Sequence, residues 1–338
     1  MNINALDLSK AFDRMCHYSL FSELMKREIP IQVLTILEKW FNESTTCIKW
    51  NGCVTHFFRL EAGVRQGGVL SPFHFSVFID SIVARVESAG VGCYIRTVCC
   101  SIFLYADDII LLSPTISGLQ VLLNVCENYL IEIGMSINVK KSVCIRFGPR
   151  FNIQCAELTT SAFGGYIKWV SCCRYLGVFF ISGRTFRCSF DNAKARFFRA
   201  FNALYSKVGR LASEEVVLSL LRCKCLPILF YATEACPLLL RTKNSLEFSI
   251  TRIFMKLFCT GSPSIVKDCQ RYFNFLPIKL QLVNRTANFL VKIIASQNNM
   301  CALFSTQASQ QLTDIFAEFS VQSIYQLRNA IDDKFYVN

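Results

Sequence analysis

The chain has 338 residues, 52% of them hydrophobic and 18% charged, which excludes an intrinsically disordered protein and provides for a large core. The formal net charge of +12 favours a polyanionic partner. The basic excess is concentrated late in the chain, since residues 1–180 carry 16 Lys and Arg against 14 Asp and Glu, whereas residues 181–338 carry 20 against 10.

The eighteen cysteines show no disulfide or zinc pattern. No C-x-x-C pair is matched by a second C-x-x-C or by an H-x-x-x-H, and free thiols fit an intracellular compartment. The sequence does not open with a signal peptide, and charged residues interrupt its most apolar stretches, 99–112 and 216–240. We therefore expect no membrane span.

Hydrophobic periodicity predicts an α+β first half and a helical second half. Asn51-Gly52 is the strongest hairpin signal, and Ser71 and Pro72 are expected to cap and open the helix after a glycine-rich loop. Expected helices cover 17–27, 31–41, 72–88 and 116–133, and expected strands cover 2–6, 45–49, 55–60, 101–104, 109–112, 137–139 and 143–147, with a further hairpin at 168–180. From about residue 189 the β signals end, and a helical bundle follows, divided at Gly209, Pro227, Pro237, Gly261-Ser262-Pro263 and Pro277.

Two adjacent carboxylates, Asp107 and Asp108, lie between the apolar runs 101–104 and 109–112. The pattern predicts a hairpin with the aspartates at its tip. Adjacent charges so close to a core need a neutralising partner, and a divalent cation is the obvious one. A solvated turn is the alternative, because adjacent aspartates at an exposed turn need no ligand.

Five blocks occur in a fixed order along the chain. They are Asp7-Leu8-Ser9-Lys10-Ala11-Phe12-Asp13, Gly63-Val64-Arg65-Gln66-Gly67-Gly68-Val69-Leu70-Ser71-Pro72, Tyr105-Ala106-Asp107-Asp108, Gly134-Met135-Ser136-Ile137-Asn138-Val139-Lys140-Lys141-Ser142 and Tyr175-Leu176-Gly177. In this order they resemble the reverse transcriptases of non-LTR (LINE-type) retrotransposons. The resemblance implies a polymerase palm, an antiparallel sheet with packed helices, at 1–188, and an all-helical thumb-like region at 189–338.

The resemblance also implies an activity, RNA-directed DNA polymerisation by two-metal nucleotidyl transfer. Asp7, Asp107 and Asp108 would be the catalytic metal ligands, because two cations about 3.5–4 Å apart need several carboxylates. Two Mg²⁺ ions are expected, or Mn²⁺ in their place, since hard oxygen ligands suit them. The implied partners are an RNA template, a DNA primer or target and deoxynucleoside triphosphates, in the nucleus and cytoplasm.

Further roles follow from the resemblance, each with a plainer alternative. Phe12 would reject a 2′-hydroxyl on the incoming nucleotide, or be a core residue. Arg65, Gln66 and Gly67 would contact the nucleotide and template, or make a tight turn. Lys141, in an N-x-x-K pattern with Asn138, would neutralise or protonate the pyrophosphate, or be solvated. The segment Tyr175-Leu176-Gly177 would position the primer end, or form an ordinary edge hairpin.

Helical spacing alone predicts an amphipathic helix near residue 200. At about 100° per residue one side carries apolar residues and the other carries four basic residues. The apolar set is Phe197, Phe198, Phe201, Leu204 and Val208, and the basic set is Arg196, Arg199, Lys207 and Arg210. We expect the basic face to contact nucleic acid, although such a face is often only solubilising.

The chain begins six residues before Asp7, whereas relatives carry a fingers region ahead of this point. We therefore expect the N-terminal fingers to be lacking. The alternative to an active polymerase is a catalytically inactive nucleic-acid-binding remnant, and a third interpretation is an unrelated metal-dependent phosphohydrolase.

Overall fold

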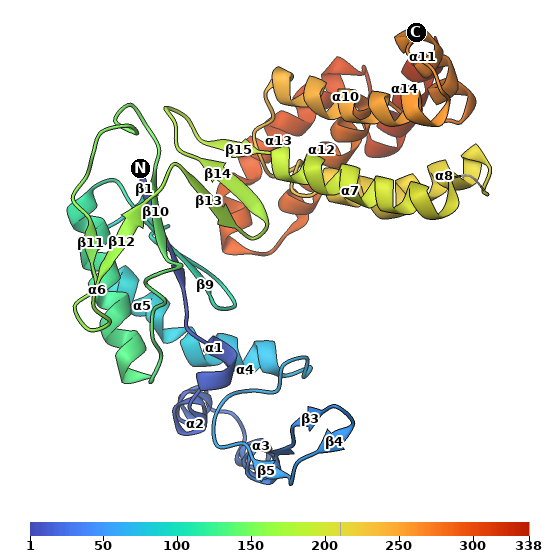
Figure 1. Ribbon diagram of the computed structural model, residues 1–338. Coiled ribbons are helices and arrows are strands. Elements are labelled where there is room, and N and C mark those ends of the chain that lie inside the picture. Colours follow the sequence, from blue (N-terminus) through green and yellow to red (C-terminus); the bar gives the residue numbers. More distant parts are fainter. Residues whose placement is uncertain (210, 338) are drawn as a thin grey trace. The chain divides into compact units, whose positions relative to one another are not determined.

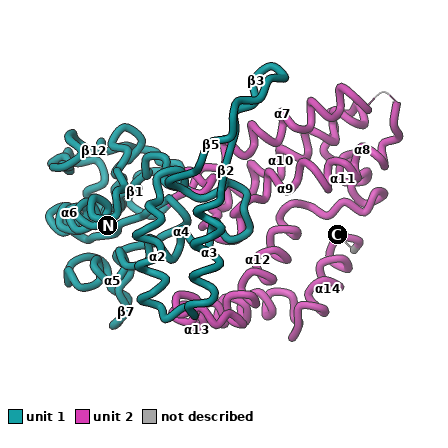
Figure 2. The backbone as a smooth tube through the Cα atoms, turned by 90° about the horizontal axis from the view of Figure 1, so that it is seen from below, with its two compact units in different colours: residues 1–175, 181–186 teal, residues 176–180, 187–338 magenta. Residues whose placement is uncertain are grey.

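The computed structural model describes residues 1–209 and 211–337. The chain consists of two compact units, coloured separately in Figure 2. The first unit comprises residues 1–175 and 181–186, and the second comprises residues 176–180 and 187–338. The first is α+β and the second is mainly helical, as the sequence predicts (Figure 1).

A six-stranded sheet with the order β11-β12-β10-β1-β9-β8 forms the centre of the first unit. Strand β1 lies between β9 and β10 and is antiparallel to both, whereas β10 and β12 run parallel. Burial along β1 does not alternate, so both of its faces are covered, although Asn2, Asn4 and Asp7 are polar. The strands are β1 (Asn2–Asp7), β8 (Ile102–Tyr105), β9 (Asp108–Ser113), β10 (Val143–Arg146), β11 (Leu158–Thr159) and β12 (Tyr166–Trp169).

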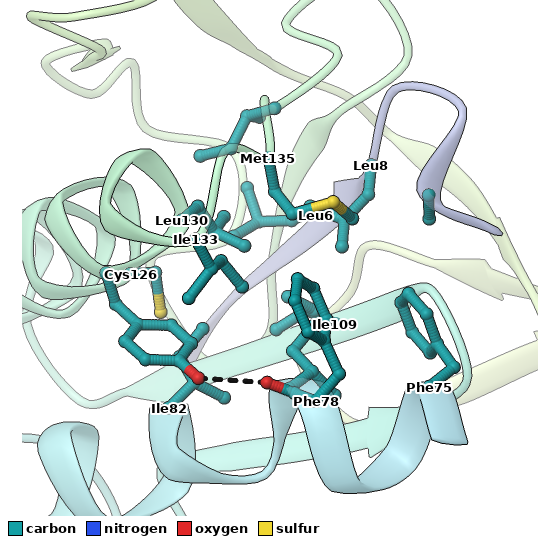
Figure 3. Packing of buried hydrophobic residues seen from close by; sticks show 14 of the residues in the cluster. Leu6, Leu8, Phe75, Phe78, Ile82, Ile109, Cys126, Leu130, Ile133 and Met135 are labelled. Carbon is teal, nitrogen blue, oxygen red and sulfur yellow. Dashed lines mark hydrogen bonds between the residues drawn. The ribbon is translucent and has the colours of Figure 1, made fainter. Parts of the chain in front are cut away.

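Helix α6 (Ile116–Glu132) packs on this sheet against β1 and β9. The side chain of Thr115 caps its N-terminus by accepting from the Gly118 N–H at 3.0 Å. Gly134, with φ +75°, allows the chain to turn away after the helix. The predicted apolar face is buried and belongs to the main core of the unit, part of which Figure 3 shows. That face comprises Leu119, Leu122, Cys126, Tyr129 and Ile133.

Five further helices complete the first unit. They are α1 (Ala11–Arg14), α2 (His17–Lys26), α3 (Ile31–Glu43), α4 (Ser71–Ile79) and α5 (Ser81–Ser88). The single helix expected at 72–88 is thus two helices that meet at Asp80. The expected Ser71 cap is wrong, because Leu70 is the N-cap and the Ser71 hydroxyl instead donates to the Arg65 carbonyl at 2.5 Å.

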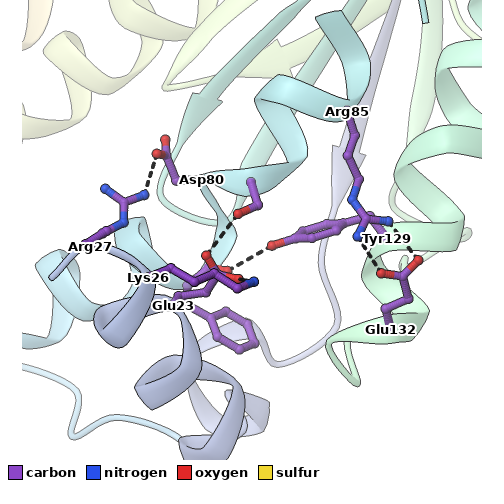
Figure 4. A network of polar contacts seen from close by, with 9 residues as sticks. Glu23, Lys26, Arg27, Asp80, Arg85, Tyr129 and Glu132 are labelled. Atoms are coloured by element: carbon purple, nitrogen blue, oxygen red, sulfur yellow. Dashed lines mark hydrogen bonds and ion pairs between the residues drawn. The ribbon is translucent and has the colours of Figure 1, made fainter. Parts of the chain in front are cut away.

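A polar network joins α2, α5 and α6 at the surface of this unit (Figure 4). Arg85 forms a two-pronged ion pair with Glu132, with N···O distances of 2.7 and 2.6 Å. Arg27 pairs with Asp80 at 2.6 Å. Exposed pairs of this kind contribute little stability, so they mainly set how the helices pack.

Short hairpins make up the remaining strands. Strands β2 (Thr45–Thr46) and β5 (Phe58–Arg59) enclose β3 (Lys49–Trp50) and β4 (Cys53–Val54), and β6 (Tyr94–Ile95) pairs with β7 (Val98–Cys99). The β3–β4 turn is Asn51-Gly52, as predicted. The hairpin expected at 168–180 differs: β12 joins the main sheet, and the hairpin is β13 (Cys172–Tyr175) with β14 (Val178–Ile181), followed in the same small sheet by β15 (Arg187–Ser189).

The second unit is built from helices packed around aromatic side chains, among them Phe197, Phe201, Phe254 and Phe275. Its helices are α7 (Asp191–Val208), α8 (Glu214–Leu220), the π-helix η1 (Leu221–Cys225), α9 (Leu226–Leu229), α10 (Leu240–Leu257), α11 (Pro263–Tyr272), α12 (Ile278–Ala295), α13 (Asn299–Glu318) and α14 (Ile324–Val337). Most predicted breaks fall between helices, but Pro227 lies inside α9, directly after the π-helix. Within the described residues, no helix is long and apolar enough to cross a membrane.

Candidate active site

The three predicted catalytic aspartates lie at one end of the main sheet. Asp7 is the last residue of β1 and is the ladder partner of Asp108, the first residue of β9. Asp107 occupies the two-residue turn between β8 and β9, beside Ala106. Residues one hundred positions apart in the sequence are thus adjacent, because antiparallel pairing of β1 with β9 fixes their register.

An open cavity of about 480 Å³ lies at this end of the sheet. Its lining includes two of the aspartates, Asp7 and Asp107, and three other predicted site residues, Phe12, Gln66 and Lys141. Ser9, Lys10, Asp13 and Asn138 complete its polar lining. Four of the five sequence blocks therefore contribute to a single cavity, which is large enough for a small-molecule ligand.

The aspartates repel one another. Partial burial raises the pKa of Asp108, and the charges of Asp107 and Asp7 raise it further. Burial, followed by the charges of Asp108 and Tyr105, raises the pKa of Tyr175 to about 12, which places this tyrosine near the same carboxylates. The only cation paired with them among the described residues is Lys141, whose Nζ is 3.8 Å from Asp7 Oδ2.

The backbone of Asp7 is held by the loop that carries Lys141. The Asp7 N–H donates to Ser142 Oγ at 3.1 Å, and the Asp7 carbonyl accepts from the Asn138 N–H at 2.8 Å. Ser142 Oγ in turn donates to the Asn138 carbonyl at 2.9 Å. These bonds therefore fix the end of β1, and they also fix the loop that carries Lys141 between Asn138 and Ser142.

The glycine-rich loop packs directly on the start of α1. The Gly63 N–H donates to the Met15 carbonyl and the Val64 N–H to the Phe12 carbonyl, both at 2.8 Å. A Cβ on Gly63 would lie 2.7 Å from the Asp13 carbonyl oxygen, so only glycine fits here. Gln66 reaches the cavity and donates to Asp13 Oδ1 at 3.1 Å.

Phe12, partly buried, packs against Phe75 of α4 with ring centroids 4.7 Å apart. It thus has both a core contact and a position on the cavity wall. Two predicted nucleotide contacts lie elsewhere. Arg65 lines a neighbouring cavity of about 360 Å³ with His17 and Trp40, and Gly67 lines neither cavity.

The turn predicted to position the primer has two residues with positive φ, Leu176 at 45° and Gly177 at 81°. Within the second unit, Tyr231 covers this turn. Its hydroxyl donates to the Leu176 carbonyl at 2.8 Å, and its ring would lie 3.1 Å from a Cβ on Gly177. No sequence motif singled out Tyr231, because the contact is between residues far apart in the chain.

Helix α7 is amphipathic as predicted. Phe197 and Phe201 are buried, whereas Arg196, Arg199 and Lys207 are exposed. Arg210, the fourth residue of the predicted basic face, lies outside the described residues.

The chemistry of the donor set suits a hard divalent cation, because carboxylates supply oxygen ligands and these carboxylates repel one another. Within residues 1–209 and 211–337, however, no three His, Cys, Asp or Glu side chains are grouped closely enough to hold a metal ion. Lys10 is a further basic residue at this site. Its backbone is left-handed, with φ 53°, and it lines the cavity just before α1.

Comparison with known proteins agrees with this geometry. The family model "Reverse transcriptase (RNA-dependent DNA polymerase)" matches residues 3–180. The chain is 27% identical over 192 residues to the Pol polyprotein of the retrotransposable element R2DM from Drosophila melanogaster, covering 54% of this chain and 18% of that protein. It is 33% identical over 146 residues to the R2 Pol polyprotein of Popillia japonica, covering 43% and 20%.

A longer match is to the RNA-directed DNA polymerase of the mobile element jockey from Drosophila melanogaster, 24% identical over 324 residues, covering 90% of this chain and 33% of that protein. The chain thus spans about a fifth to a third of the length of these relatives. A telomerase structure from Candida albicans is also similar, with 13% identity, a TM-score of 0.46 and coverage of 96% of this chain and 48% of that one. The family match covers more than half of the chain and includes the aspartates, the glycine-rich loop and the lysine loop, so this chain belongs to the reverse transcriptase family.

Proposed function

We propose that this chain is an RNA-directed DNA polymerase of a non-LTR retrotransposon, which extends a DNA primer on an RNA template with deoxynucleoside triphosphates. The observation that carries the proposal is the convergence of Asp7, Asp107 and Asp108 at one sheet end beside the cavity lined by Phe12, Gln66 and Lys141. Family membership and the homology to R2 and jockey polymerases support it.

Although no three His, Cys, Asp or Glu side chains among the described residues are grouped closely enough to hold an ion in this arrangement, Asp7, Asp107 and Asp108 would hold two Mg²⁺ ions, or Mn²⁺ in their place. When bound, these ions activate the primer 3′-hydroxyl and neutralise the triphosphate. The raised pKa of Asp108 supports this assignment, because like charges are gathered where only one lysine opposes them among the described residues. A bound cation would remove that repulsion.

The other cavity residues take roles that fit their positions. Lys141 Nζ, near Asp7, would neutralise or protonate the departing pyrophosphate. Phe12 is held in place by Phe75 and would exclude a ribose 2′-hydroxyl by bulk. Gln66, oriented by Asp13, would contact the nascent base pair. Arg65 and Gly67 would contact the template from the same loop.

Nucleic acid beyond the reacting nucleotide would be held by the turn at Tyr175-Leu176-Gly177 and by the exposed basic residues of α7. The turn would position the primer end. Contacts from Arg196, Arg199 and Lys207 would go to phosphates, so we expect them to be independent of sequence and sensitive to salt. A location in the nucleus and cytoplasm belongs to the same proposal.

Primer extension tests the function directly. A labelled DNA primer annealed to RNA should be extended by the unmodified chain in the presence of Mg²⁺ and the four deoxynucleoside triphosphates. Asp107→Asn should lower the rate about a thousandfold or more, since a metal ligand supports several kcal/mol of transition-state stabilisation. RNA binding should be retained.

A matched control is Asp80→Asn, which removes one carboxylate from an exposed ion pair with Arg27 away from the cavity. It should leave extension unchanged. If the unmodified chain binds primer and template but extends nothing with either Mg²⁺ or Mn²⁺, it is a nucleic-acid-binding protein without polymerase activity, and the proposal is wrong.

A further inference from the structure

A second cavity, of about 390 Å³, lies entirely within the second unit. Two arginines, Arg222 and Arg285, contribute to its lining, and no acidic side chain among the described residues lines it. Asn274, Gln281 and Asn284 add amide groups, and Leu226, Pro227, Phe230 and Leu276 form an apolar wall. None of these residues belongs to the sequence blocks that carry the family resemblance.

Both guanidinium groups are held in fixed positions. Arg222 Nη2 donates to the carbonyls of Phe273 and Asn274, at 2.6 and 2.8 Å, just after the end of α11. Its guanidinium carbon also lies 5.2 Å from the centroid of the Phe275 ring. A guanidinium has five N–H donors, so these bonds leave others available to an anion.

Arg285 is fixed in a similar way. Its Nη2 donates to Glu234 Oε1 at 2.9 Å, and its guanidinium carbon lies 5.3 Å from the centroid of the Phe230 ring. Its Nε is buried and has no hydrogen-bond partner in the described structure. A buried donor without a partner is costly, so a bond from this Nε to an anion would be favourable.

The amide groups are also incompletely used. Gln281 donates to the Leu276 carbonyl through Nε2, and Asn284 Oδ1 accepts from Asn288. The acceptor of Gln281 and the donor of Asn284 have no partner among the described residues, so both can bond to a polar ligand. Donors and acceptors beside an apolar wall suit the edge and face of a nucleobase.

The backbone that carries Arg222 is unusual. Arg222 lies in the π-helix η1, and Pro227 follows it in α9. Because proline has no N–H, the regular bonding of the preceding turn is interrupted, and the π-turn accommodates the break. Such single π-turns are frequent at functional sites, and here the π-turn places Arg222 at the cavity.

We infer that this cavity binds one nucleotide of a single-stranded nucleic acid, with its phosphate at Arg222 and Arg285 and its base between the apolar wall and the amides. The basic excess of the second half of the chain favours a strand over a free nucleotide, because neighbouring phosphates add to the attraction. The inference rests on the proposed function, because that function supplies such a strand. RNA and DNA share the chemistry recognised here.

Photo-crosslinking to the unmodified chain tests the site. The probes are twelve-nucleotide single strands, one of RNA and one of DNA, each carrying a single 4-thiopyrimidine and incubated with the chain in EDTA. Crosslinked peptides should come from residues 222–230 or 274–285. The probe that crosslinks more strongly shows whether the strand is RNA or DNA. Crosslinks confined to α7 or to the first unit would overturn the inference.

Binding by variants gives the second test, measured by fluorescence anisotropy with the same strands. Arg222→Ala should weaken binding about tenfold, because it removes charge-assisted hydrogen bonds. Lys224→Ala is the matched control. It removes the same charge from the same π-helix, where Lys224 is exposed and does not line the cavity, and it should weaken binding by only about twofold. Equal losses in the two variants would contradict a specific site.

Arg222 also supports the end of α11, so a variant that does not depend on that support is needed. Asn274→Gly removes an amide from the cavity wall and tolerates the positive φ of 47° at this position. It should weaken binding about threefold while circular dichroism stays unchanged. EDTA abolishes synthesis but not binding. A chain without polymerase activity can therefore still confirm this site. An active polymerase without crosslinks in the cavity would refute the site and leave the proposed function unaffected.

Discussion

Two hairpins in the first unit have turns of the same length but different local chemistry. The β3–β4 turn is Asn51-Gly52, with φ values of 45° and 82°, and the flanking pair is Trp50 with Cys53. The β8–β9 turn contains Ala106, with φ 53°. Asn and Gly adopt positive φ at low cost, whereas alanine pays about 1–2 kcal/mol for it.

The difference shows which part of the structure offsets the conformational cost of the Ala106 turn. The hairpin with the relaxed turn is exposed on both strands, whereas β9 runs through the core, with Ile109 and Leu111 fully buried. Lys10 and Leu176 also have positive φ and lie in two other sequence blocks that resemble the polymerase family. Positive φ at a non-glycine residue is not confined to these blocks, since seven of the ten such residues in the described structure lie elsewhere. At Ala106, packing of the surrounding sheet stabilises the turn.

The largest expected effect comes from removing that support. Ile109→Ala deletes a fully buried side chain directly behind the aspartates, at the point where β9 pairs with Leu6 of β1 (Figure 3). We expect a loss of about 2–5 kcal/mol in the free energy of unfolding, because a cavity is left in the core. Urea denaturation followed by circular dichroism measures it.

The equivalent change in the other hairpin is Val54→Ala. Val54 is 55% exposed, so truncating it should cost less than about 0.5 kcal/mol. A similar loss in both variants would mean that the β8–β9 hairpin does not depend on core packing.

The next effect concerns the relaxed turn itself. Gly52→Ala places a Cβ at φ 82° where no other atom lies within 4 Å, so the cost is conformational and not steric. We expect a loss of about 1 kcal/mol in stability, seen as a lower denaturation midpoint, with primer extension unchanged. A large loss of extension would mean that this hairpin, which does not line the cavity beside the aspartates, takes part in synthesis.

Local patterns were sufficient to predict much of the fold and part of the site. Strand β1 up to Asp7, the hairpin tip at Asp107 and helix α6 up to Gly134 follow from alternation and periodicity, which act over a few residues. The order of the sequence blocks indicated that the aspartates would meet. The assembled sheet shows the register, Asp7 opposite Asp108, that brings two of them together.

Features that depend on distant partners were not predictable from such patterns. A strand pattern at 166–169 does not reveal that its partner is β10. The Ser71 hydroxyl donates to the Arg65 carbonyl because the folded loop brings Arg65 within reach. The bond from Tyr231 to Leu176 and the π-turn before Pro227 have no local signature of their own. Each depends on which segments the assembled fold brings together.

A smaller effect is expected when the strained turn is relaxed. Ala106→Gly removes the penalty for positive φ but adds flexibility to the unfolded chain, so stability should rise by at most about 1 kcal/mol. The same flexibility loosens the position of Asp107, and the rate of primer extension should fall about tenfold or less. Single-turnover extension and a thermal melt measure the two changes.

Ser88→Gly, at the end of α5, is a control that adds glycine away from the cavity. It should not slow extension. Unchanged extension in Ala106→Gly would show that the fixed turn has no role in catalysis.

The smallest effect is a pH dependence confined to the acidic turn. The pKa of Asp108 is raised in the folded chain, by burial first and then by Asp107 and Asp7, above its ordinary value of 3.8. Between these two pKa values the folded state binds more protons than the unfolded state, so this group lowers stability as pH rises through that window. Above the pKa that Asp108 has in the folded chain, the loss of stability is complete and no longer changes with pH.

Asp108→Asn removes the charge and keeps the shape. In metal-free buffer it should therefore melt slightly higher than the unmodified chain at pH 7, and the difference should vanish at a pH below 3.8. Mg²⁺ should stabilise the unmodified chain more than the variant, because a bound cation relieves the same repulsion. Asp80→Asn, which removes a carboxylate paired with Arg27, should not melt higher at pH 7. A variant at Asp108 that melts lower at pH 7 without metal would show that its carboxylate stabilises the fold, contrary to the repulsion that distinguishes this turn from Asn51-Gly52.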